Sequence, residues 1–454
     1  MFKKVLIANR GEVAVRVIRA CREIGIPTVA VYSEADADSL HVSLATEAYC
    51  IGPKESSKSY LNIPAIISTA LISGADAIHP GYGFMSESAA FAEICEQHGI
   101  KFIGPTGAAI RKMGDKAQAR ATMLEKNIPI TPGTGLVDDI EKAKKFCKKA
   151  GYPVIVKATA GGGGKGMRIV NKESELEENI VLCKTEAQKF FGNAGVYIEK
   201  YLVNPRHIEV QILADKQGNV VYLGERDCSI QRRHQKLVEE APSPAVNEKI
   251  REKLGKTAVR VAKAVKYEGV GTVEFLLDKD NNFYFMEMNT RLQVEHGITE
   301  MITNIDIVRE QINISAGYPL SVSQRDIVIK GHAIECRINA EDPDKNFMPA
   351  AGLINGYVAP GGFGVRVDSH VYSGYAIPPY YDSLISKLIC WAPDREQARR
   401  RMYRALKEYV ITGVHTTLPF YQDLIEDSVF MQGNFDTGFL EDYNKRKADK
   451  HKNE

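Results

Sequence analysis

The sequence lacks several features that would place the protein outside the ordinary globular class. No apolar run among its 454 residues is long enough to span a membrane. The first four residues lead directly into a short strand-like segment, which leaves no room for a signal peptide. The eight cysteines stand singly, without the paired spacings of zinc sites or disulfide frameworks. We therefore expect a cytoplasmic protein with reduced thiols and no membrane partner.

A large charge of one sign is also missing. The chain has 59 Lys and Arg residues against 57 Asp and Glu residues, a formal net charge of +2. This balance gives no support for a nucleic-acid partner. The hydrophobic share of 44% excludes disordered and fibrous classes. A chain of this length can bury more than one core, so we expect roughly two to four domains.

Five short apolar runs near the N-terminus alternate with helix-like stretches. They lie at residues 4–8, 27–32, 47–51, 76–79 and 101–103. This rhythm predicts a parallel sheet covered by helices, in a Rossmann-like N-terminal domain over residues 1–112. The G-x-G-x-x-G fingerprint of dinucleotide sites is missing after the first strand, so we do not expect an NAD site.

The rest of the chain divides at stretches rich in glycine and proline. We expect a helical connector over residues 113–129 and a small mobile lid over 130–203. A C-terminal lobe over 204–445 begins with strands and ends with helices, and residues 446–454 have the composition of a disordered tail. The overall fold class is α/β.

A glycine run inside the predicted lid is the first candidate for chemistry. A buried strand over residues 152–157 is followed by four glycines at 161–164 and by Lys165. Glycine lets backbone N–H groups approach phosphate oxygens, and Lys157 and Lys165 add positive charge. This is not a Walker A loop, because Gly-Lys-Ser/Thr is missing. A flexible linker is the alternative, but linkers seldom lie between two strands.

Two glutamates are placed opposite each other by a predicted hairpin. Strand-like residues 272–277 and 283–288 flank a turn at 278–282, and a loop of two or four residues gives the same register. Glu274 then faces Glu287, with Asn289 on the same side and Met286 on the apolar side. Opposed carboxylates and an amide suit Mg²⁺ or Mn²⁺. A solvated sheet face is the alternative interpretation.

Polar residues continue to alternate beyond Asn289, where the first strand offers no partner. Arg291, Gln293 and Glu295 should therefore leave the sheet and line a cleft. An arginine, an amide and a carboxylate beside a metal–phosphate site could hold a small oxyanion and remove its proton.

Three further polar patterns are less specific. His207, Glu209 and Gln211 share one face of a predicted strand, which a half-exposed strand would also explain. A basic cluster follows, and an anionic substrate is its favoured ligand; it comprises Arg226, Arg232, Arg233, His234 and Lys236. Arg337 shares a strand face with Glu335 and Asn339, and a structural ion pair explains it equally well.

Six segments together closely resemble the biotin carboxylases across nearly the whole chain. They are Ile-Ala-Asn-Arg-Gly-Glu at 7–12, His-Pro-Gly-Tyr-Gly-Phe at 79–84, and residues 157–167, 225–236, 287–296 and 335–343. The resemblance implies an ATP-grasp fold, in which a lid closes over ATP against a larger C-terminal lobe.

The resemblance also implies roles for individual residues. Tyr82, Glu87 and Arg337 would border biotin, and Glu274, Glu287 and Asn289 would bind Mg²⁺ or Mn²⁺, with two ions expected. Bicarbonate would be held by Lys236, Arg291, Gln293 and Val294. The residues implied to contact ATP are Lys116, Lys157, Gly163, Gly164, Glu199, Lys200, Tyr201, Leu202, His207, Gln231, His234, Glu274 and Glu287.

In the mechanism implied by the resemblance, Glu295 deprotonates bicarbonate, which attacks the γ-phosphate of ATP. The resulting carboxyphosphate yields CO₂ and phosphate, and the phosphate takes a proton from the ureido nitrogen of biotin. Arg337 stabilises the biotin oxyanion, and Lys236 and Arg291 complete the catalytic set.

The partners follow from what the chain does not contain. No segment of the chain resembles the Ala-Met-Lys-Met site that carries biotin, and none resembles a carboxyltransferase domain. Biotin would therefore arrive on a separate carrier protein, and a separate carboxyltransferase would use the product. Arg19, Glu23, Phe363 and Arg366 match positions of the family's homodimer interface. Gly297 departs from the family, where proline or another residue is common.

We expect the first half-reaction of acetyl-CoA carboxylase in fatty acid synthesis. The close alternative is the ATP-dependent chain of a two-subunit pyruvate carboxylase. An ATP-grasp carboxylate–amine ligase and a non-catalytic nucleotide-binding regulator rank lower, because Glu295, Arg337 and all the metal ligands are present.

Overall fold

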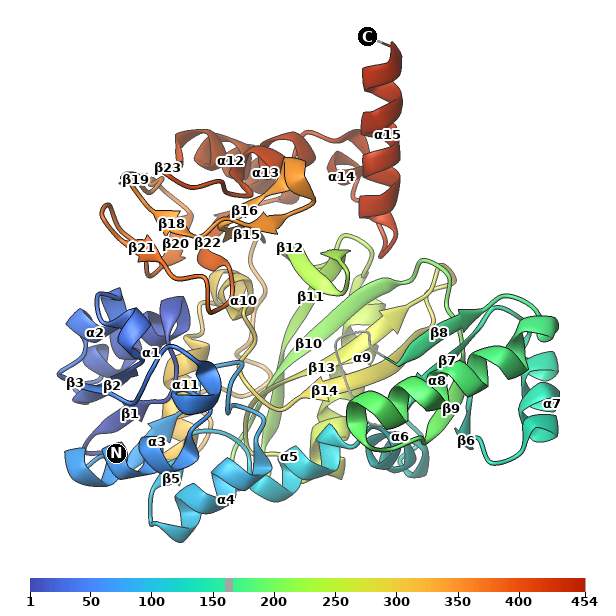
Figure 1. Ribbon diagram of the computed structural model, residues 1–454, viewed down its shortest axis with the longest axis horizontal. Helices are drawn as coiled ribbons and strands as arrows, with labels where there is room; N and C mark the ends of the chain where they lie inside the picture. Colours follow the sequence, from blue (N-terminus) through green and yellow to red (C-terminus); the bar gives the residue numbers. More distant parts are fainter. Residues whose placement is uncertain (160–165, 454) are drawn as a thin grey trace.

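The N-terminal part of the computed structural model, which describes residues 1–159 and 166–453, is a five-stranded sheet with strand order β3-β2-β1-β4-β5 (Figure 1). All its neighbouring strands are parallel, as the five apolar runs predicted. Alternate residues of β1 enter two different cores, so both faces of the sheet are buried. The strands are β1 (Val5–Ile7), β2 (Thr28–Tyr32), β3 (Glu47–Cys50), β4 (Ala77–His79) and β5 (Lys101–Phe102).

Helices cover this sheet and lead out of it. The ordered elements are α1 (Gly11–Glu23), α2 (Leu40–Leu44), α3 (Ile63–Ser73), α4 (Ala89–Gln97), α5 (Gly107–Gly114) and α6 (Lys116–Glu125), with short 3₁₀ turns at Glu34–Asp36 and Ser56–Lys58. Helix α1 is amphipathic and buries most of its length against the sheet and the C-terminal lobe.

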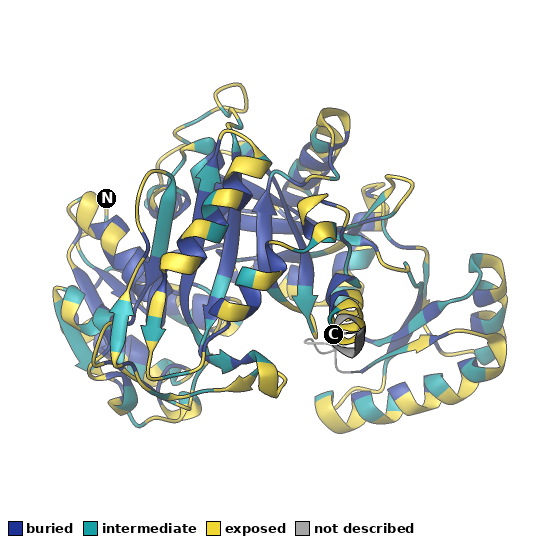
Figure 2. Cartoon of the chain, turned by 90° about the horizontal axis from the view of Figure 1, so that it is seen from above, coloured by how far each residue is buried: buried dark blue, intermediate teal, exposed yellow. Residues whose placement is uncertain are grey.

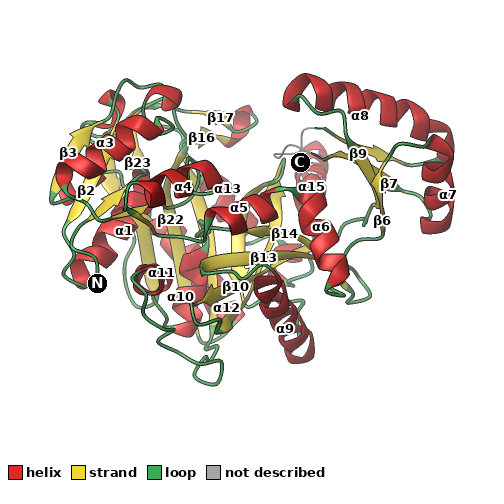
Figure 3. Ribbon diagram, turned by 90° about the horizontal axis from the view of Figure 1, so that it is seen from below, coloured by secondary structure: helices red, strands yellow, loops and turns green. Residues whose placement is uncertain are grey.

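The predicted lid is an antiparallel sheet with its own core. Its strand order is β6-β9-β7-β8, and Val154, Val156 and Ile198 pack against two helices. Figure 3 shows this unit to one side of the larger sheet. Its elements are β6 (Gly133–Leu136), α7 (Ile140–Ala150), β7 (Val154–Ala158), β8 (Met167–Val170), the 3₁₀ turn Glu173–Glu175, α8 (Leu176–Phe191) and β9 (Val196–Lys200).

An eight-stranded antiparallel sheet forms the C-terminal lobe, in the order β14-β13-β10-β11-β12-β15-β22-β20. Figure 2 shows its strands buried and the outer faces of its helices exposed. Its strands are β10 (Arg206–Ala214), β11 (Val220–Arg232), β12 (Gln235–Ala241), β13 (Gly269–Leu277), β14 (Phe283–Asn289), β15 (His332–Asn339), β20 (Val365–Ser369) and β22 (Leu384–Ala392).

The remaining elements surround this sheet. They are α9 (Glu248–Ala264), α10 (His296–Thr303), α11 (Ile307–Ser315), β16 (Glu341–Asp342), the 3₁₀ turn Pro343–Lys345, β17 (Met348–Pro349), β18 (Gly352–Leu353), β19 (Gly356–Val358), β21 (Ala376–Ile377), α12 (Arg395–Glu408), β23 (Val410–Thr412), α13 (Leu418–Leu424), α14 (Ser428–Met431) and α15 (Phe439–Asn453). Within the described ranges, no helix combines the length and apolarity needed to cross a bilayer.

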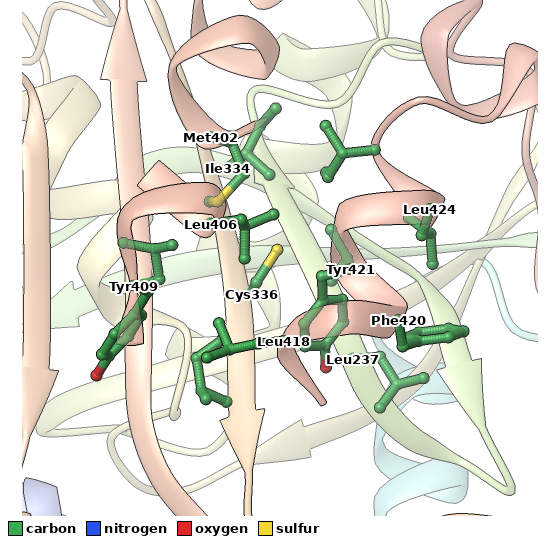
Figure 4. Close-up of a cluster of buried hydrophobic side chains, with 14 of the residues drawn as sticks. Leu237, Ile334, Cys336, Met402, Leu406, Tyr409, Leu418, Phe420, Tyr421 and Leu424 are labelled. Atoms are coloured by element: carbon green, nitrogen blue, oxygen red, sulfur yellow. The ribbon is translucent and has the colours of Figure 1, made fainter. Parts of the chain in front are cut away.

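The core beneath α12 and α13 fixes which face of β15 carries polar residues. Ile334 and Cys336 point into a cluster with Met402, Leu406 and Tyr421 (Figure 4). Because side chains alternate along a strand, Glu335, Arg337 and Asn339 are turned to the opposite face. This is the arrangement that the sequence pattern predicted.

The hairpin of β13 and β14 agrees with the sequence prediction at one end and differs at the other. Glu274 pairs with Glu287 as predicted, but Phe275 pairs with Phe285, so a bulge at Met286 shifts the register. The loop therefore has five residues, 278–282, and not two or four. Met286 is 36% exposed and Phe285 only 6%, so Phe285 takes the core position that was predicted for Met286.

The C-terminus also differs from the expectation. Residues 446–454 were expected to be a disordered tail, but α15 continues over 446–453, the described part of this segment. Arg446 pairs with Asp427 and Lys447 with Asp423, and these contacts tie the helix to the rest of the lobe.

Candidate active site

A row of three carboxylates crosses the larger sheet. Glu209 of β10 lies opposite Glu274 of β13, which in turn lies opposite Glu287 of β14. The neighbouring residues Val210 and Val273 face the core, so all three glutamates share the other face of the sheet. Such a row is unfavourable unless cations lie among the carboxylates.

Lys236 of β12 supplies one of these cations. Its Nζ lies 2.6 Å from Glu209, 3.1 Å from Glu274 and 2.6 Å from Glu295. Burial alone would lower the pKa of Lys236, but the surrounding Cys228 and carboxylates hold it well above its usual value. The lysine is therefore charged and joins the carboxylate row to Glu295.

Arg226 holds Glu209 from the other side. It is fully buried and donates to Glu209, to Gln211 at 2.8 Å, to Thr299 at 2.9 Å and to Thr272 at 3.2 Å. Its guanidinium is enclosed and engaged inside the protein, so it is not available to bind a substrate.

Glu295 stands just before α10, as its N-cap residue. It is fully buried, and its two oxygens accept from different cations: Oε1 from Lys236 at 2.6 Å and Oε2 from Arg337 at 3.0 Å. Burial would raise the pKa of Glu295, but Lys236 and Arg337 outweigh it and hold the pKa well below the usual value. The carboxylate is therefore ionised. Arg337 also donates to Glu239 at 2.6 Å.

Glu274 is surrounded by polar partners. His207 Nε2 lies 2.9 Å from its Oε2, while Asn289 donates to Oε1 at 2.8 Å and Gln293 at 3.1 Å. Burial would raise the pKa of Glu274, but Lys236 and His207 hold it below the usual range. In the described part of the chain, close trios of possible metal ligands are His207 with Glu209 and Glu274, and Glu209 with Cys228 and Glu295.

Glu287 differs from its neighbour. It forms no hydrogen bond or ion pair with the described residues, and burial together with the charge of Glu274 raises its pKa. A carboxylate without a partner among the described residues, opposite an ionised one, is the chemistry that a divalent cation would satisfy. The residues present therefore fit a metal site formed by Glu274, Glu287 and the Asn289 oxygen.

Residues 290–295 leave the sheet, as predicted, and Arg291 organises them. It donates to Glu87 at 2.9 Å, to Gln293 at 2.9 Å and to Asn289 at 3.0 Å. The segment therefore joins the metal-site residues to a loop of the N-terminal domain. Val294 and Glu295 follow directly in the chain.

The candidate ATP residues of the lid lie on its inner strands. Lys157 Nζ lies 2.6 Å from Glu199, which also pairs with Arg120. Lys200 donates to the carbonyl groups of Gly151 and Tyr152. The other members of the predicted set in this region are Tyr201 and Leu202, which follow β9, and Lys116, which begins α6; Gly163, Gly164 and Lys165 lie outside the described residues.

The predicted basic cluster does not form one surface. Arg226 is buried, whereas Arg232 packs over the Phe347 ring and donates to Asn346. His234 lies in the turn between β11 and β12 with a φ of 66°, and Gln231 pairs with Lys236 across it. Among the described members of this cluster, Arg226 and Lys236 both contact the carboxylate row, whereas Arg232 is turned toward Asn346 and Phe347.

The residues predicted to border biotin lie on two segments: Tyr82 and Glu87 in the loop between β4 and α4, and Arg337 on β15. Glu87 contacts Arg291, and Arg337 contacts Glu295. The Tyr82 hydroxyl donates to Glu12. Among the described residues, no hydrogen bond joins Tyr82 directly to Glu87 or Arg337.

Sequence reasoning missed Glu12, Glu239 and Lys387. Lys387 is fully buried in β22, and its Nζ donates to the carbonyl oxygen of Val294 at 2.8 Å. The available signal was a single charged residue, Lys387, within the largely apolar stretch 384–392.

Comparisons with known proteins agree with this geometry. Residues 1–110 match the biotin carboxylase N-terminal domain, residues 115–323 the ATP-binding domain of the carbamoyl-phosphate synthase L chain, and residues 335–442 the biotin carboxylase C-terminal domain. A biotin carboxylase of Nostoc sp. is 59% identical over 445 residues, which cover 98% of this chain and 100% of that protein. A pyruvate carboxylase subunit from Methanothermobacter thermautotrophicus is 54% identical, with 98% and 91% covered.

Solved structures match equally well. A biotin carboxylase complex with a β,γ-ATP ligand from Campylobacter jejuni has a TM-score of 0.93 at 51% identity and covers 97% of this chain and 98% of that one. The biotin carboxylase domain dimer of Hydrogenobacter thermophilus 2-oxoglutarate carboxylase, in complex with MgADP, ADP and bicarbonate, has a TM-score of 0.92 at 53% identity, with 98% of each chain covered. These matches confirm the expected ATP-grasp fold.

Proposed function

Because the chain belongs to the biotin carboxylase family, we propose that it is an ATP-dependent ligase that carboxylates biotin with bicarbonate. The observation that carries the proposal is Glu295, a fully buried and ionised carboxylate bound by Lys236 and Arg337. A carboxylate of this kind, beside a second set of polar groups on residues 291–294, fits a base acting on a small oxyanion.

Glu295 becomes a stronger base when substrates bind. In the free protein, Lys236 and Arg337 stabilise its ionised form, which makes it a weak proton acceptor. Bicarbonate held by Lys236, Arg291, Gln293 and the Val294 backbone would share Lys236, and biotin would share Arg337. With each cation divided between two anions, the pKa of Glu295 rises and proton transfer from bicarbonate becomes easier. The deprotonated bicarbonate then attacks the γ-phosphorus of ATP, which forms carboxyphosphate and releases ADP.

Glu274, Glu287 and Asn289 would hold Mg²⁺ or Mn²⁺. When bound, the metal would neutralise the phosphate charge of ATP, and we expect two ions. The solved complex with MgADP supports magnesium in a related protein. Around the metal, His207 keeps Glu274 oriented through its 2.9 Å contact, and Gln293 links the same carboxylate to the oxyanion-binding segment.

The lid would bind the nucleotide between its inner strands and the larger sheet. Lys157 is held beside Glu199 at 2.6 Å, from where it can turn to a phosphate group. The other proposed ATP contacts lie at the hinge, in the β11–β12 hairpin and in the glycine run: Lys116, Gly163, Gly164, Glu199, Lys200, Tyr201, Leu202, Gln231 and His234. We propose that residues 130–203 form the lid and that residues 113–129 connect it to the N-terminal domain at 1–112. The C-terminal lobe then covers residues 204–445.

Arg337 would stabilise the oxyanion of biotin, with Tyr82 and Glu87 at the edge of the same pocket. Replacing Arg337 by Ala should reduce biotin carboxylation far more than ATP binding. The contacts of Arg337 with two buried carboxylates support this role, because they aim the guanidinium at the site.

We further propose that biotin arrives on a separate carrier protein and that a separate carboxyltransferase receives the product. Acetyl-CoA carboxylase is the favoured context. Pyruvate carboxylase is the alternative, because a subunit of one such enzyme is 54% identical. A domain of a 2-oxoglutarate carboxylase is also 53% identical. That domain forms a dimer, which supports a homodimer for this chain. We propose that Arg19, Glu23, Phe363 and Arg366 lie at its interface. Eight unpaired cysteines support a cytoplasmic location.

The test is ADP release by the purified chain with ATP and Mg²⁺, measured with and without bicarbonate and free biotin. The proposal predicts that stimulation requires both compounds. ADP release that depends on neither, but on a carboxylate and an amine, would identify another ATP-grasp ligase. Nucleotide binding without any turnover would identify a regulator.

A further inference from the structure

A buried lysine holds the active-site segment from behind. Lys387 lies in β22 with no exposed surface, and the nearby β22 residues Ile385 and Leu388 belong to the apolar core. Its Nζ donates to the Val294 carbonyl at 2.8 Å. Val294 immediately precedes Glu295, so this hydrogen bond fixes the peptide plane that leads into the base.

Two carboxylates hold Lys387 in place. Asp368 Oδ2 lies 3.7 Å from Nζ and Glu12 Oε2 lies 3.3 Å away. The contact with Glu12 is an ion pair rather than a hydrogen bond, since Glu12 Oε2 has no hydrogen-bond partner among the described residues. Burial would lower the pKa of Lys387, but Glu12, Glu335 and Asp368 raise it above the usual value. The lysine therefore donates as a cation.

Glu12 also serves a second segment. It lies in the first turn of α1, is 4% exposed, and its Oε1 accepts the hydrogen bond from the Tyr82 hydroxyl. One ion pair between the N-terminal domain and β22 thus touches both Tyr82 and Val294. The two contacted segments are those assigned above to biotin and to bicarbonate.

We propose that Glu12 and Lys387 are a pair of positioning residues that set Tyr82 and the Val294–Glu295 peptide relative to each other. This inference rests on the proposed function, because it assigns these segments to the two substrates. Residues 290–295, which the structure describes in full, form no strand, so their backbone groups are not held by a sheet ladder. Lys236 and Arg337 hold Glu295 by its side chain, and Lys387 holds the same segment by its backbone.

The test separates positioning from simple stabilisation of the fold. Lys387→Met leaves Glu12 without its cation, so both the melting temperature and kcat should fall. In the double variant Glu12→Gln/Lys387→Met, the pair is neutral and the new amide oxygen can still accept from Tyr82. We expect the double variant to regain most of the lost melting temperature while kcat stays about ten- to a hundredfold below wild type, because Val294 still lacks its donor. The KM for ATP should remain within about twofold in every variant, since no ATP contact is changed.

Wild-type kcat in the double variant would overturn the inference, as would a parallel loss of ATP binding. If Lys387→Met and the double variant fail to fold, Glu12→Gln alone decides: it loosens Lys387 without removing it, so kcat should fall by about two- to fivefold. An unchanged kcat would refute the positioning role. Failure of the proposed function looks different, because wild-type protein would then show no ADP release that requires bicarbonate and biotin.

Discussion

Replacing Glu295 by Gln tests the assignment of the base with little change in shape. Glutamine occupies almost the same volume but cannot accept a proton from bicarbonate. Loss of a general base typically lowers kcat by about 10²- to 10⁴-fold, and we expect a loss in that range. ATP should bind as in wild type, because Glu295 contacts Lys236 and Arg337 and none of the described lid residues.

The structure also sets the expected stability of this variant. Removing one partner of a buried ion pair typically costs about 3–5 kcal/mol when the other charge is left alone. Here neither cation is left alone: Lys236 keeps Glu209 at 2.6 Å and Glu274 at 3.1 Å, and Arg337 keeps Glu239. We therefore expect a smaller loss, about 1–2 kcal/mol.

A matched control lies on β12. Glu240 is buried like Glu295 and has two partners of its own, His332 at 2.6 Å and Arg395 at 2.7 Å, away from the carboxylate cluster. Glu240→Gln should destabilise the fold yet retain kcat per folded molecule. The assay is bicarbonate-dependent ADP release with thermal unfolding of each variant. Near-wild-type kcat in Glu295→Gln, or an equal loss in the control, would refute the assignment of Glu295 as the base.

Three further predictions concern stability and metal binding. Burial would raise the pKa of Glu240, but Arg395 and His332 lower it to about 2. The ionised carboxylate therefore contributes roughly 3 kcal/mol to the free energy of unfolding. This contribution is present above pH 4.5 and is lost as the pH falls toward 2. In urea unfolding, the free energies of unfolding of wild type and Glu240→Gln should differ most above about pH 5 and become similar at low pH. A difference that stays constant with pH would contradict this. A Cβ on Gly297 would lie 2.4 Å from Ile389 Cδ1. Gly297→Ala should therefore lower the free energy of unfolding by about 1 kcal/mol, and adding Ile389→Val should relieve that loss. If the stability losses of the two substitutions simply add, this contact is not the cause. Glu287→Gln should raise the Mg²⁺ concentration for half-maximal ADP release about tenfold, and an unchanged requirement would remove Glu287 from the metal site.

The sequence was most informative where chemistry follows a local repeat. Alternating apolar runs predicted the five parallel strands, and strand periodicity placed Glu274 opposite Glu287. The bulge at Met286 was not predictable, because Phe285 and Met286 are both apolar and either can occupy the core position. The core selects phenylalanine there through its contacts with Phe275.

Contacts between distant segments were beyond prediction from this sequence alone. The pairing of Lys387 with Glu12 depends on how β22 packs against α1, and no local pattern specifies that packing. The prediction of one basic surface over Arg226–Lys236 was wrong for the opposite reason. Its members are close in sequence, but strand alternation and the β11–β12 turn point their side chains in different directions. The resemblance to a family supplied the substrates, which spacing could not identify.

We expect Glu295, with Lys236 and Arg337, to couple ATP cleavage to the transfer of the bicarbonate carbon onto biotin. The most direct measurement follows ¹⁴C from labelled bicarbonate into carboxybiotin, with ADP measured in the same reaction, for wild type and Glu295→Gln. We predict equal amounts of labelled carboxybiotin and ADP from wild type, and neither product above background from the variant. Release of ADP by the wild-type protein without label in biotin would contradict this coupling.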